Sequence, residues 1–593
     1  MLDRGKMPFL TLTGGNLAAG LEHHRAERTA EAITCYGAAL AESPDHPRIL
    51  GLLGQLQIAA GELDAGLHHL ERAAELVPEH DETSFAFANG CVAAGRYDKA
   101  ADQYRTLLAR APAHLGAALN LISLLRHRNE PAAMRDVALD ALAHHPEHPR
   151  LLLALAAGAL HDRAAATALV LLDRTIEYEP DLAEAHFLRG TALNMEGRSA
   201  EALDAQYCAI ALKPNHAAAH LNLGNALADL DRTLEAEEYC RLALAIDPGL
   251  VEAYASLGYI YTRLGRLDQA ILACRRALEL SPQHAYAHWN LGIASLLAGD
   301  WSEGWRQYEW RKCPELYAAH FHIPRGEEWK GGELAGRTLT ICAEQGLGDA
   351  IQLARYIPML AERGAELILS CARPLVPLFV NFPQLSVVLD RTDPLPDADL
   401  WVDQMSLPGL FGTLPENIPG AAGYISADPV RVLRWRGLLP DGVKVGLVWG
   451  GNPLHSNDRR RSIPPADLEE LLDISGISLI SVQAGRPVPL EWEGRIFNAA
   501  PHLGDFAETA ACIANLDLVI TVDTAVGHLA GAMGRCVWTM LPFTPDWRWL
   551  ACRADTPWYD SMRLFRQSHD RDWSSPVREV VAALRLRLAA ELS

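Results

Sequence analysis

Proline recurs at one constant interval through the first half of this chain. Successive members stand 34 residues apart, and they are Pro44, Pro78, Pro112, Pro146, Pro180, Pro214, Pro248 and Pro282. Glycine and alanine recur in the same frame, as at Gly54, Gly190 and Gly224 and at Ala32, Ala100 and Ala168. Proline ends a helix because its ring blocks the preceding turn, and small residues at fixed positions let two helices cross closely. The interval therefore predicts a stack of helical hairpins.

This pattern resembles that of tetratricopeptide repeats. We expect eight full repeats from about Thr11 to Pro282, and a further hairpin from Gln283 to about Arg311. Each repeat buries its apolar face only against its neighbours, so such an array forms a solenoid with a concave groove. Grooves of this kind bind an extended peptide or a helix of a partner, and we therefore expect a protein partner.

Asparagine occupies one position of the repeat three times, at Asn120, Asn222 and Asn290. In the array of protein O-GlcNAc transferases, which this array resembles, asparagines at a similar position line the groove and hold the substrate backbone. The resemblance implies an acceptor-binding role for all three. The alternative is that they are solvated or pack between repeats, since asparagine is ordinarily a surface residue.

Aromatic residues gather at the end of the array, in the stretch DWSEGWRQYEWR. Trp301, Trp305 and Tyr308 recur at four- and three-residue spacing, which places them on one face of a helix. The last helix of a solenoid needs a cover for its apolar side. We expect this face to dock the array on the following domain rather than to bind a sugar.

The pattern changes after Trp329. Short apolar runs now alternate with helical stretches, which is typical of parallel sheets covered by helices. One series begins at Thr338–Ala343 and a second at Val443–Trp449. Two such lobes facing each other across a cleft suit the GT-B arrangement of glycosyltransferases. The predicted fold class is α + α/β, with an N-terminal tetratricopeptide solenoid followed by a GT-B domain of two Rossmann-like lobes.

Four segments follow from these patterns. They are a repeat array (1–312), a linker that docks the array (313–336), an acceptor-side lobe (337–430) and a donor-side lobe (431–593). An amphipathic helix at 576–592 is expected to pack back on either lobe.

The stretch LDLVITVDTAVGHLAGAMGR, from Leu516 to Arg535, predicts a buried strand that turns into a helix. Asp523 or Thr524 is a suitable N-cap, and the small residues that follow would let a phosphate approach the backbone. The first amides of that helix would lie at the carboxyl edge of a parallel sheet, where phosphates bind. Thr524 and His528 would add side-chain donors. The alternative is an ordinary strand-to-helix turn.

A carboxylate follows the first strand of the first lobe, in ICAEQGLGD. The strand is expected to end near Ala343, so that Asp349 stands at the start of a helix and faces the cleft. A carboxylate there can accept a proton from an attacking hydroxyl, which is the work of a general base. The alternative is a plain N-cap aspartate.

The second lobe opens with KVGLVWGGNPLHSNDRRRSIP. Polar and basic residues follow its glycine turn in one loop, and those assigned to the donor are Asn452, His455, Arg459 and Arg460. Arginines at this sheet edge would neutralise a leaving phosphate, whereas the alternative is a solvated run of charge. Gln483, at the end of the next strand, is expected to meet a base or ribose. Residues 546–549 would stack on a base or close the cleft.

Three motifs in order, EQGLGD, GLVWGGNPLHSNDRRRSI and VDTAVGHLAGAMG, resemble those of the ADP-heptose:lipopolysaccharide heptosyltransferase-like glycosyltransferases. Behind a tetratricopeptide array they resemble the bacterial flagellin glycosyltransferases. The resemblance implies that Asp349 is the catalytic base and that Asp523, Thr524 and His528 bind the phosphates of the donor.

One position departs from the heptosyltransferase pattern, because Ala525 stands where that family usually has glycine. A flagellin transferase of this kind would use a CMP-activated nonulosonic acid in place of a nucleotide-diphosphate heptose. A single phosphate needs less approach to the backbone, which is compatible with alanine.

Composition argues against several classes of function. A formal net charge of −21 argues against general binding of nucleic acid or anionic membranes. No apolar run is long enough to span a bilayer, so we expect no membrane insertion. The 11 cysteines are scattered without metal-binding spacing, which indicates reduced thiols in a cytoplasm. The Asp-x-Asp strings at 229–231, 397–399 and 570–572 lie away from the donor helix, so we expect no metal and no cofactor.

The leading hypothesis is a cytoplasmic, metal-independent and inverting protein O-glycosyltransferase. The array would hold the acceptor protein, which the resemblance implies is flagellin, and the second lobe would hold the nucleotide sugar. Asp349 would take the proton from a Ser or Thr hydroxyl as it attacks the anomeric carbon. Two alternatives remain. One is a scaffold or adaptor with catalytically silent lobes, and the other is a heptosyltransferase-like enzyme that acts on a glycan or lipid acceptor.

Overall fold

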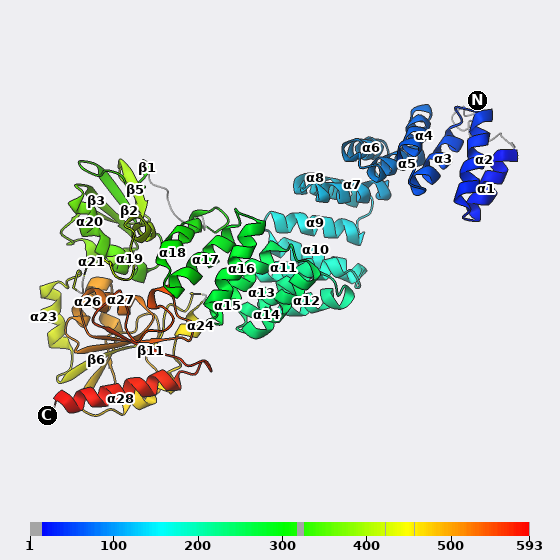
Figure 1. Ribbon diagram of the computed structural model, residues 1–593. Coiled ribbons are helices and arrows are strands. Elements are labelled where there is room, and N and C mark those ends of the chain that lie inside the picture. Colours follow the sequence, from blue (N-terminus) through cyan, green and yellow to red (C-terminus); the bar gives the residue numbers. More distant parts are fainter. Residues whose placement is uncertain (1–14, 317–324, 421–422, 456, 592–593) are drawn as a thin grey trace. The chain divides into compact units, whose positions relative to one another are not determined.

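The computed structural model describes residues 15–316, 325–420, 423–455 and 457–591 (Figure 1). The chain falls into two compact units, Met1–Ile246 and Asp247–Ser593. Thr11, the expected start of the first repeat, lies outside the described residues, as does part of the expected linker.

The described part of the first unit is a series of helical hairpins, one for each 34-residue step. Its helices are α1 (Gly15–Arg25), α2 (Thr29–Glu42), α3 (Pro47–Ala59), α4 (Leu63–Leu76), α5 (Asp81–Ala93), α6 (Tyr97–Arg110), α7 (Leu115–His127), α8 (Pro131–Leu142), α9 (Pro149–His161), α10 (Ala165–Tyr178), α11 (Ala183–Met195), α12 (Ser199–Leu212), α13 (Ala217–Asp229) and α14 (Thr233–Ile246). Pro44 and Pro78 stand just past the ends of α2 and α4. Because proline disfavours a helix at the residue before it, the interval sets where these second helices end.

Small residues lie where the helices of a hairpin cross. Ala32, Ala100 and Ala168 have no exposed surface. A Cβ added at Gly54 in α3 would lie 2.8 Å from the carbonyl oxygen of Gly66 in α4. The two backbones approach so closely that only glycine fits, which explains why small residues recur in the sequence.

The second unit opens with two more hairpins. They are α15 (Val251–Arg263) with α16 (Leu267–Leu280), and α17 (Ala285–Ala298) with α18 (Trp301–Tyr308), which continues as the 3₁₀ turn η1 (Glu309–Lys312). The expected aromatic face of α18 is buried, and it packs on both lobes. Trp305 meets Trp547 edge to face with ring centroids 5.0 Å apart, and Trp301 stacks on Trp558 at 5.2 Å. The docking role predicted for this face is confirmed.

The first lobe is a parallel sheet with strand order β1-β5-β2-β3-β4. Its strands are β1 (Glu327–Glu328), β2 (Thr338–Cys342), β3 (Glu366–Cys371), β4 (Leu385–Asp390) and β5 (Leu400–Asp403). Its short helices are α19 (Leu347–Leu353), α20 (Ile357–Glu362), α21 (Val376–Phe379) and α22 (Leu407–Leu410).

The second lobe is a parallel sheet with strand order β11-β10-β9-β6-β7-β8. Its strands are β6 (Val443–Val448), β7 (Ile477–Ser481), β8 (Phe497–Asn498), β9 (Leu518–Val522), β10 (Val537–Leu541) and β11 (Met562–Arg566). Its helices are α23 (Pro429–Leu438), α24 (Asp458–Arg461), α25 (Glu469–Leu472), α26 (Phe506–Ile513), α27 (Ala525–Ala532) and α28 (Ser574–Glu591).

Helical repeats followed by two parallel sheets confirm the predicted fold class. Three strands were not predicted. β1 and β8 are two residues long, which is too short for a pattern, and β11 contains two arginines in its five residues. The last helix, α28, packs on the second lobe, where Val577, Val580 and Leu584 join the core of its sheet.

Candidate functional site

Asp349 lies in the first turn of α19, just past the carboxyl end of β2. Gly346 is the N-cap of this helix, and Oδ2 of Asp349 accepts a hydrogen bond from the Gly346 amide at 2.7 Å. The side chain keeps 21% of its surface exposed. Asp349 is therefore the third residue of its helix and not the N-cap that the alternative held, and its carboxylate, which binds the amide of the N-cap residue, is still accessible.

The other carboxylate oxygen of Asp349 meets the second lobe. Oδ1 lies 2.6 Å from Nη2 of Arg548, which stands on the 3₁₀ turn η8 (Trp547–Trp549) after β10. Nη1 of Arg548 pairs with Asp546 at 2.7 Å, and Nε donates to Gln352 of α19 at 2.6 Å. An ion pair thus joins the two lobes at the predicted base.

A second acid lies close by but is not available as a base. Glu344, at the end of β2, is buried and pairs with Arg311 of η1 at 3.2 Å. Burial raises the pKa of Glu344 to about 7, against the opposing pull of Arg311. This pair ties the last turn of the array to the first lobe, whereas Asp349 is the accessible carboxylate.

The helix start predicted to bind phosphate follows β9. Thr524 is the N-cap of α27 in an extended conformation, and its hydroxyl lies 2.9 Å from that of Thr521. In the described chain, the amides of the first turn, from Ala525 to Gly527, donate to no other group. Unsatisfied amides at a helix N-terminus favour an anion, because the helix dipole adds to their partial positive charge.

Gly348 brings the acid and this helix start together. A Cβ added at Gly348 would lie 2.8 Å from Cδ2 of His528 and 3.5 Å from Cα of Ala525. The first turns of α19 and α27 therefore cross in contact, one from each lobe. A glycine is required at this point, and the next residue along the chain is Asp349.

His528 lies in this crossing rather than on its surface. The residue is 4% exposed, and its ring stacks on Trp549 with centroids 5.1 Å apart. Nδ1 lies 3.0 Å from the hydroxyl of Tyr559. Burial, and then Arg548, hold the pKa of His528 well below its usual range, so the ring is neutral at pH 7. Its role towards the donor stays a prediction.

Asp523 lies at the carboxyl end of β9, beside the same helix start. Its Oδ1 is 3.9 Å from Nε2 of His528. Burial raises the pKa of Asp523 to about 6, with Asp546 adding to the rise and Arg461 opposing it. This carboxyl group therefore changes charge within the physiological range, next to the predicted phosphate position.

The glycine turn after β6 is enclosed by two arginines. A Cβ at Gly450 would lie 2.6 Å from Nε of Arg486, and one at Gly451 would lie 2.7 Å from Nε of Arg461. Arg486 also donates to the carbonyl of Gly451 at 3.2 Å and pairs with Asp458. The two glycines therefore leave room for guanidinium groups beside the strand end.

Gln483 shapes this turn from the neighbouring strand. Its side-chain oxygen accepts from the amides of Trp449 and Gly450 at 3.1 and 2.9 Å, and its amide donates to the carbonyl of Gly450 at 3.0 Å. The residue is 2% exposed. The side chain therefore binds the turn, and its contact with a base or ribose stays a prediction.

The remaining donor residues lie on the stretch that leads into α24, which was expected as a loop. Asn452 accepts from the amide of Leu454 at 3.0 Å, and Nδ1 of His455 accepts from the amide of Asn457 at 3.1 Å. The one-turn helix α24 carries Arg459, Arg460 and Arg461. Their roles towards a donor stay predictions.

The three asparagines of the array make hydrogen bonds to the preceding repeat. Asn120 donates to Asn89 at 2.8 Å, and Asn222 donates to Thr191 at 2.9 Å. Asn290 donates to the carbonyl of Ala255 at 3.0 Å. Their amide groups pack between repeats, as the alternative held, and their contact with an acceptor stays a prediction.

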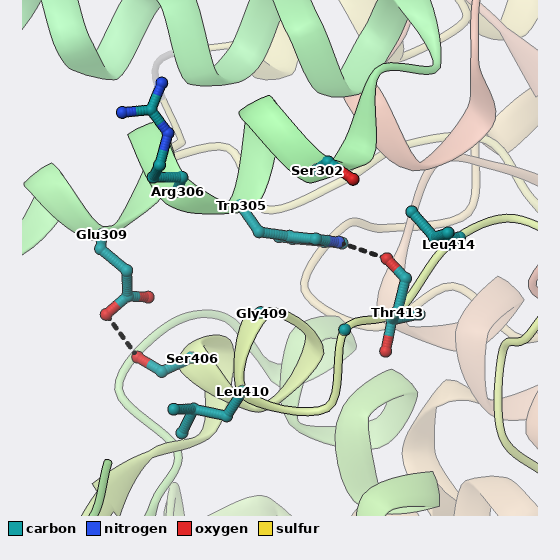
Figure 2. Close-up of a pocket in the computed structure, with 10 residues that line it drawn as sticks. Ser302, Trp305, Arg306, Glu309, Ser406, Gly409, Leu410, Thr413 and Leu414 are labelled. Atoms are coloured by element: carbon teal, nitrogen blue, oxygen red, sulfur yellow. Dashed lines mark hydrogen bonds between the residues drawn. The ribbon is translucent and has the colours of Figure 1, made fainter. Parts of the chain in front are cut away.

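A cavity of about 440 Å³ lies at the joint between α18 and the first lobe (Figure 2). Trp305 spans it and donates to the carbonyl of Thr413 at 2.8 Å, while Glu309 accepts from Ser406 at 3.0 Å (Figure 2). None of the predicted site residues lines it. The cavity therefore belongs to the joint and not to the candidate site.

Two features of the described residues concern metals and membranes. No group of three or more His, Cys, Asp or Glu side chains is placed to hold a metal ion. Within the same residues, every helix is too short or too polar to cross a bilayer.

The contacts of two arginines at the site were not predicted from the sequence. Arg548 was expected only to close the cleft or stack, and its pairing with Asp349 needs the two lobes in place. Arg486 follows Gln483 closely at the carboxyl edge of the sheet, so the rule that selected the other strand ends applies to it as well.

Family models match separate parts of the chain. Models described as tetratricopeptide repeats match residues 23–89, 85–149, 208–251 and 251–284, and one described as glycosyltransferase family 9 (heptosyltransferase) matches residues 490–569. The chain carries tetratricopeptide repeats, and residues 490–569 of its second lobe resemble glycosyltransferase family 9. The glycosyltransferase match contains Asp523, His528 and Arg548, which supports glycosyltransferase activity.

A curated relative is Protein FlbA of Caulobacter vibrioides, which is 33% identical over 328 residues. The match covers 49% of this chain and 53% of FlbA, so the chain spans about half the length of this relative.

Among solved structures, MamA is 25% identical with a TM-score of 0.24 and covers 28% of this chain and 95% of its own. TTC0263, a tetratricopeptide protein of Thermus thermophilus, is 24% identical with a TM-score of 0.27 and covers 30% and 97%. Likeness at these scores says nothing of activity.

Proposed function

We propose that this chain is an inverting protein O-glycosyltransferase that transfers a nonulosonic acid from a CMP-activated donor to Ser or Thr of flagellin. The array holds the acceptor, and transfer takes place in the cytoplasm without a metal or cofactor. The observation that carries the proposal is the crossing at Gly348, where the acid of one lobe meets the open helix start of the other.

Asp349 accepts the proton of the acceptor hydroxyl, whose oxygen attacks the anomeric carbon. The bond between that carbon and the phosphate oxygen breaks, and its electron pair leaves with the nucleotide. The amides at the start of α27 and the guanidinium of Arg461 stabilise the negative charge on the departing phosphate. Attack opposite the leaving group gives inversion.

A donor with a single phosphate suits the helix start. Ala525 stands at its first position, and Gly348 of the facing lobe lies against the Ala525 backbone. A single phosphate reaches the α27 amides with less approach to this backbone than a diphosphate needs. Flagellin is proposed as the acceptor because the motifs resemble those of flagellin glycosyltransferases. Protein FlbA is a relative of this chain.

The test is a transfer assay with the full chain. Purified flagellin is incubated with a CMP-activated nonulosonic acid or with ADP-heptose, and the intact mass of flagellin is measured. We expect a mass increase with the CMP donor and none with D349N. Modification of a glycan or lipid acceptor, but not of protein, would favour a heptosyltransferase-like enzyme. Capture of flagellin without transfer from any donor would favour an adaptor.

A further inference from the structure

Arg548 is an arginine of the second lobe whose partners lie largely in the first. Its side chain is 6% exposed. Nη2 lies 2.6 Å from Asp349, and Nε donates to Gln352 at 2.6 Å. These two partners stand three residues apart in α19, so they lie on one face of that helix. Nη1 is held by Asp546 of its own loop at 2.7 Å.

This arrangement allows the guanidinium a single orientation. The cation lies over the ring of Trp547 at 4.1 Å, and Nη2 also approaches the sulfur of Met405 at 3.8 Å. A buried guanidinium is costly unless its donors are paired in the plane of the fork. Each nitrogen has a partner here, so any rotation breaks at least one charge-assisted bond.

The loop that carries Arg548 is itself fixed in place. Leu550, two residues on, is not glycine and yet has a φ of 51°. Strained backbone of this kind persists only where the surroundings determine it, and it concentrates at functional sites. The ring of Trp547 meets that of Trp305 on the last helix of the array at 5.0 Å. Packing from the array and strain in the loop together set the position of the arginine.

We propose that Arg548 is the positioning residue of Asp349: it holds the carboxylate in the orientation for proton transfer, and only when the two lobes are closed. Oδ1 of Asp349 is tied to Arg548 and Oδ2 to the amide of Gly346, so each oxygen keeps one lone pair for the acceptor hydroxyl. Because Asp349 is on one lobe and Arg548 on the other, opening the lobes releases the acid. This proposal rests on the proposed function of Asp349.

The test compares R548Q with R553Q, a matched change at an exposed arginine that pairs with Asp555 in the same lobe. With flagellin and the CMP donor, we expect kcat of R548Q to fall by about a hundredfold, since a displacement near 1 Å costs that much. The KM for the donor should change by less than about threefold, because the arginine acts through Asp349. R548K should recover only part of kcat, since an ammonium cannot reproduce the fork. R553Q should behave as wild type.

Two results would overturn the proposal. One is a kcat for R548Q within about threefold of wild type, and the other is a loss confined to the KM of the donor, which would make Arg548 a donor ligand. If R548Q does not fold, D546N keeps the arginine and removes one of its anchors. That variant should lose kcat with an unchanged donor KM, and an unchanged kcat would equally overturn the proposal.

Hydrogen exchange gives a readout that does not depend on transfer. In R548Q, amides of residues 347–353 should exchange faster than in R553Q, because α19 loses its bonds to the second lobe. Equal exchange in the two variants would contradict the positioning role. Absence of transfer by wild type would instead refute the proposed function and leave the exchange result standing by itself.

Discussion

The indole nitrogen of Trp305 donates a hydrogen bond of 2.8 Å to the carbonyl oxygen of Thr413, which lies 108 residues further along the chain. Trp305 belongs to the last helix of the array, and Thr413 belongs to the first lobe. The same ring packs edge to face on Trp547 of the second lobe. One side chain therefore ties the end of the array to both lobes.

Replacing Trp305 with alanine is expected to lower the free energy of unfolding of the second unit by about 3–5 kcal/mol, because a buried aromatic ring and its hydrogen bond are lost. Denaturant unfolding followed by tryptophan fluorescence measures this. R306A is the matched control, since Arg306 pairs with Glu303 at the surface and should cost at most about 1 kcal/mol. If the two substitutions lowered the free energy of unfolding equally, Trp305 would not stabilise the joint between the array and the lobes.

Gly348→Ala is expected to push the two lobes apart. The new methyl group would lie 2.8 Å from the ring of the buried His528, and overpacking of this kind costs about 1–3 kcal/mol. We expect a lower melting temperature and slower transfer. The control is Gly437→Ala in α23, where a Cβ meets nothing within 4 Å. A wild-type rate for G348A would show that the crossing is not needed in catalysis.

Asp523 is expected to make donor binding depend on pH. Its pKa is about 6 in the folded protein, raised from an ordinary 3.8 by burial, so the group gains negative charge as pH rises through 6. That charge repels a phosphate at the start of α27. Affinity for a methyl ester of CMP, whose phosphate does not titrate here, should fall by about tenfold from pH 5.5 to 7.5. Calorimetry of wild type and D523N measures this, and the dependence should vanish in D523N.

Titration of Asp523 also changes the free energy of unfolding with pH. Between pH 3.8 and about 6 the folded state keeps a proton that the unfolded state releases, so the contribution of Asp523 is lost as pH rises through 6. The free energy of unfolding of D523N relative to wild type should therefore increase from pH 4 to pH 7. A constant difference across this range would mean that Asp523 is not buried in the uncharged form.

Asn290→Ala is expected to lower the free energy of unfolding of the second unit by about 1 kcal/mol. Its amide donates to the carbonyl of Ala255 in the preceding repeat, and a typical intramolecular hydrogen bond contributes about that much. Urea unfolding measures it, and the KM for flagellin is measured on the same variant. A higher KM with no loss of stability would mean that the asparagine holds the acceptor and does not pack the repeats.

Periodic parts of the structure could be predicted because their cause is local. Pro44 and Pro78 end helices whatever surrounds them, and Gly54 fits a close crossing that recurs in several hairpins, as at Gly224. The strand before Asp523 is a mostly apolar run, which is typical of a strand buried on both faces. Short elements lacked such a pattern, and β11, with its two arginines, was missed for that reason.

The site residues show the same difference between local features, which a sequence records, and contacts between distant segments, which it does not. The positions of Asp349 and Thr524 near strand ends could be predicted because the sheet edge is fixed by the topology, and their roles stay predictions. The burial of His528 could not be predicted, because Gly348 of the other lobe lies against its ring. Gln483 likewise binds the Gly450 turn, a contact between neighbouring strands that the sequence does not show.

By itself the sequence determined the solenoid, the two parallel sheets and the strand ends where polar groups gather, because helix ends, small-residue crossings and apolar runs are properties of nearby residues. Only the tertiary structure decided which group meets which across the lobes. The pairing of Asp349 with Arg548, 199 positions apart, depends on how two independently formed sheets close on each other. Packing and charge between surfaces set that contact, and no local spacing records it.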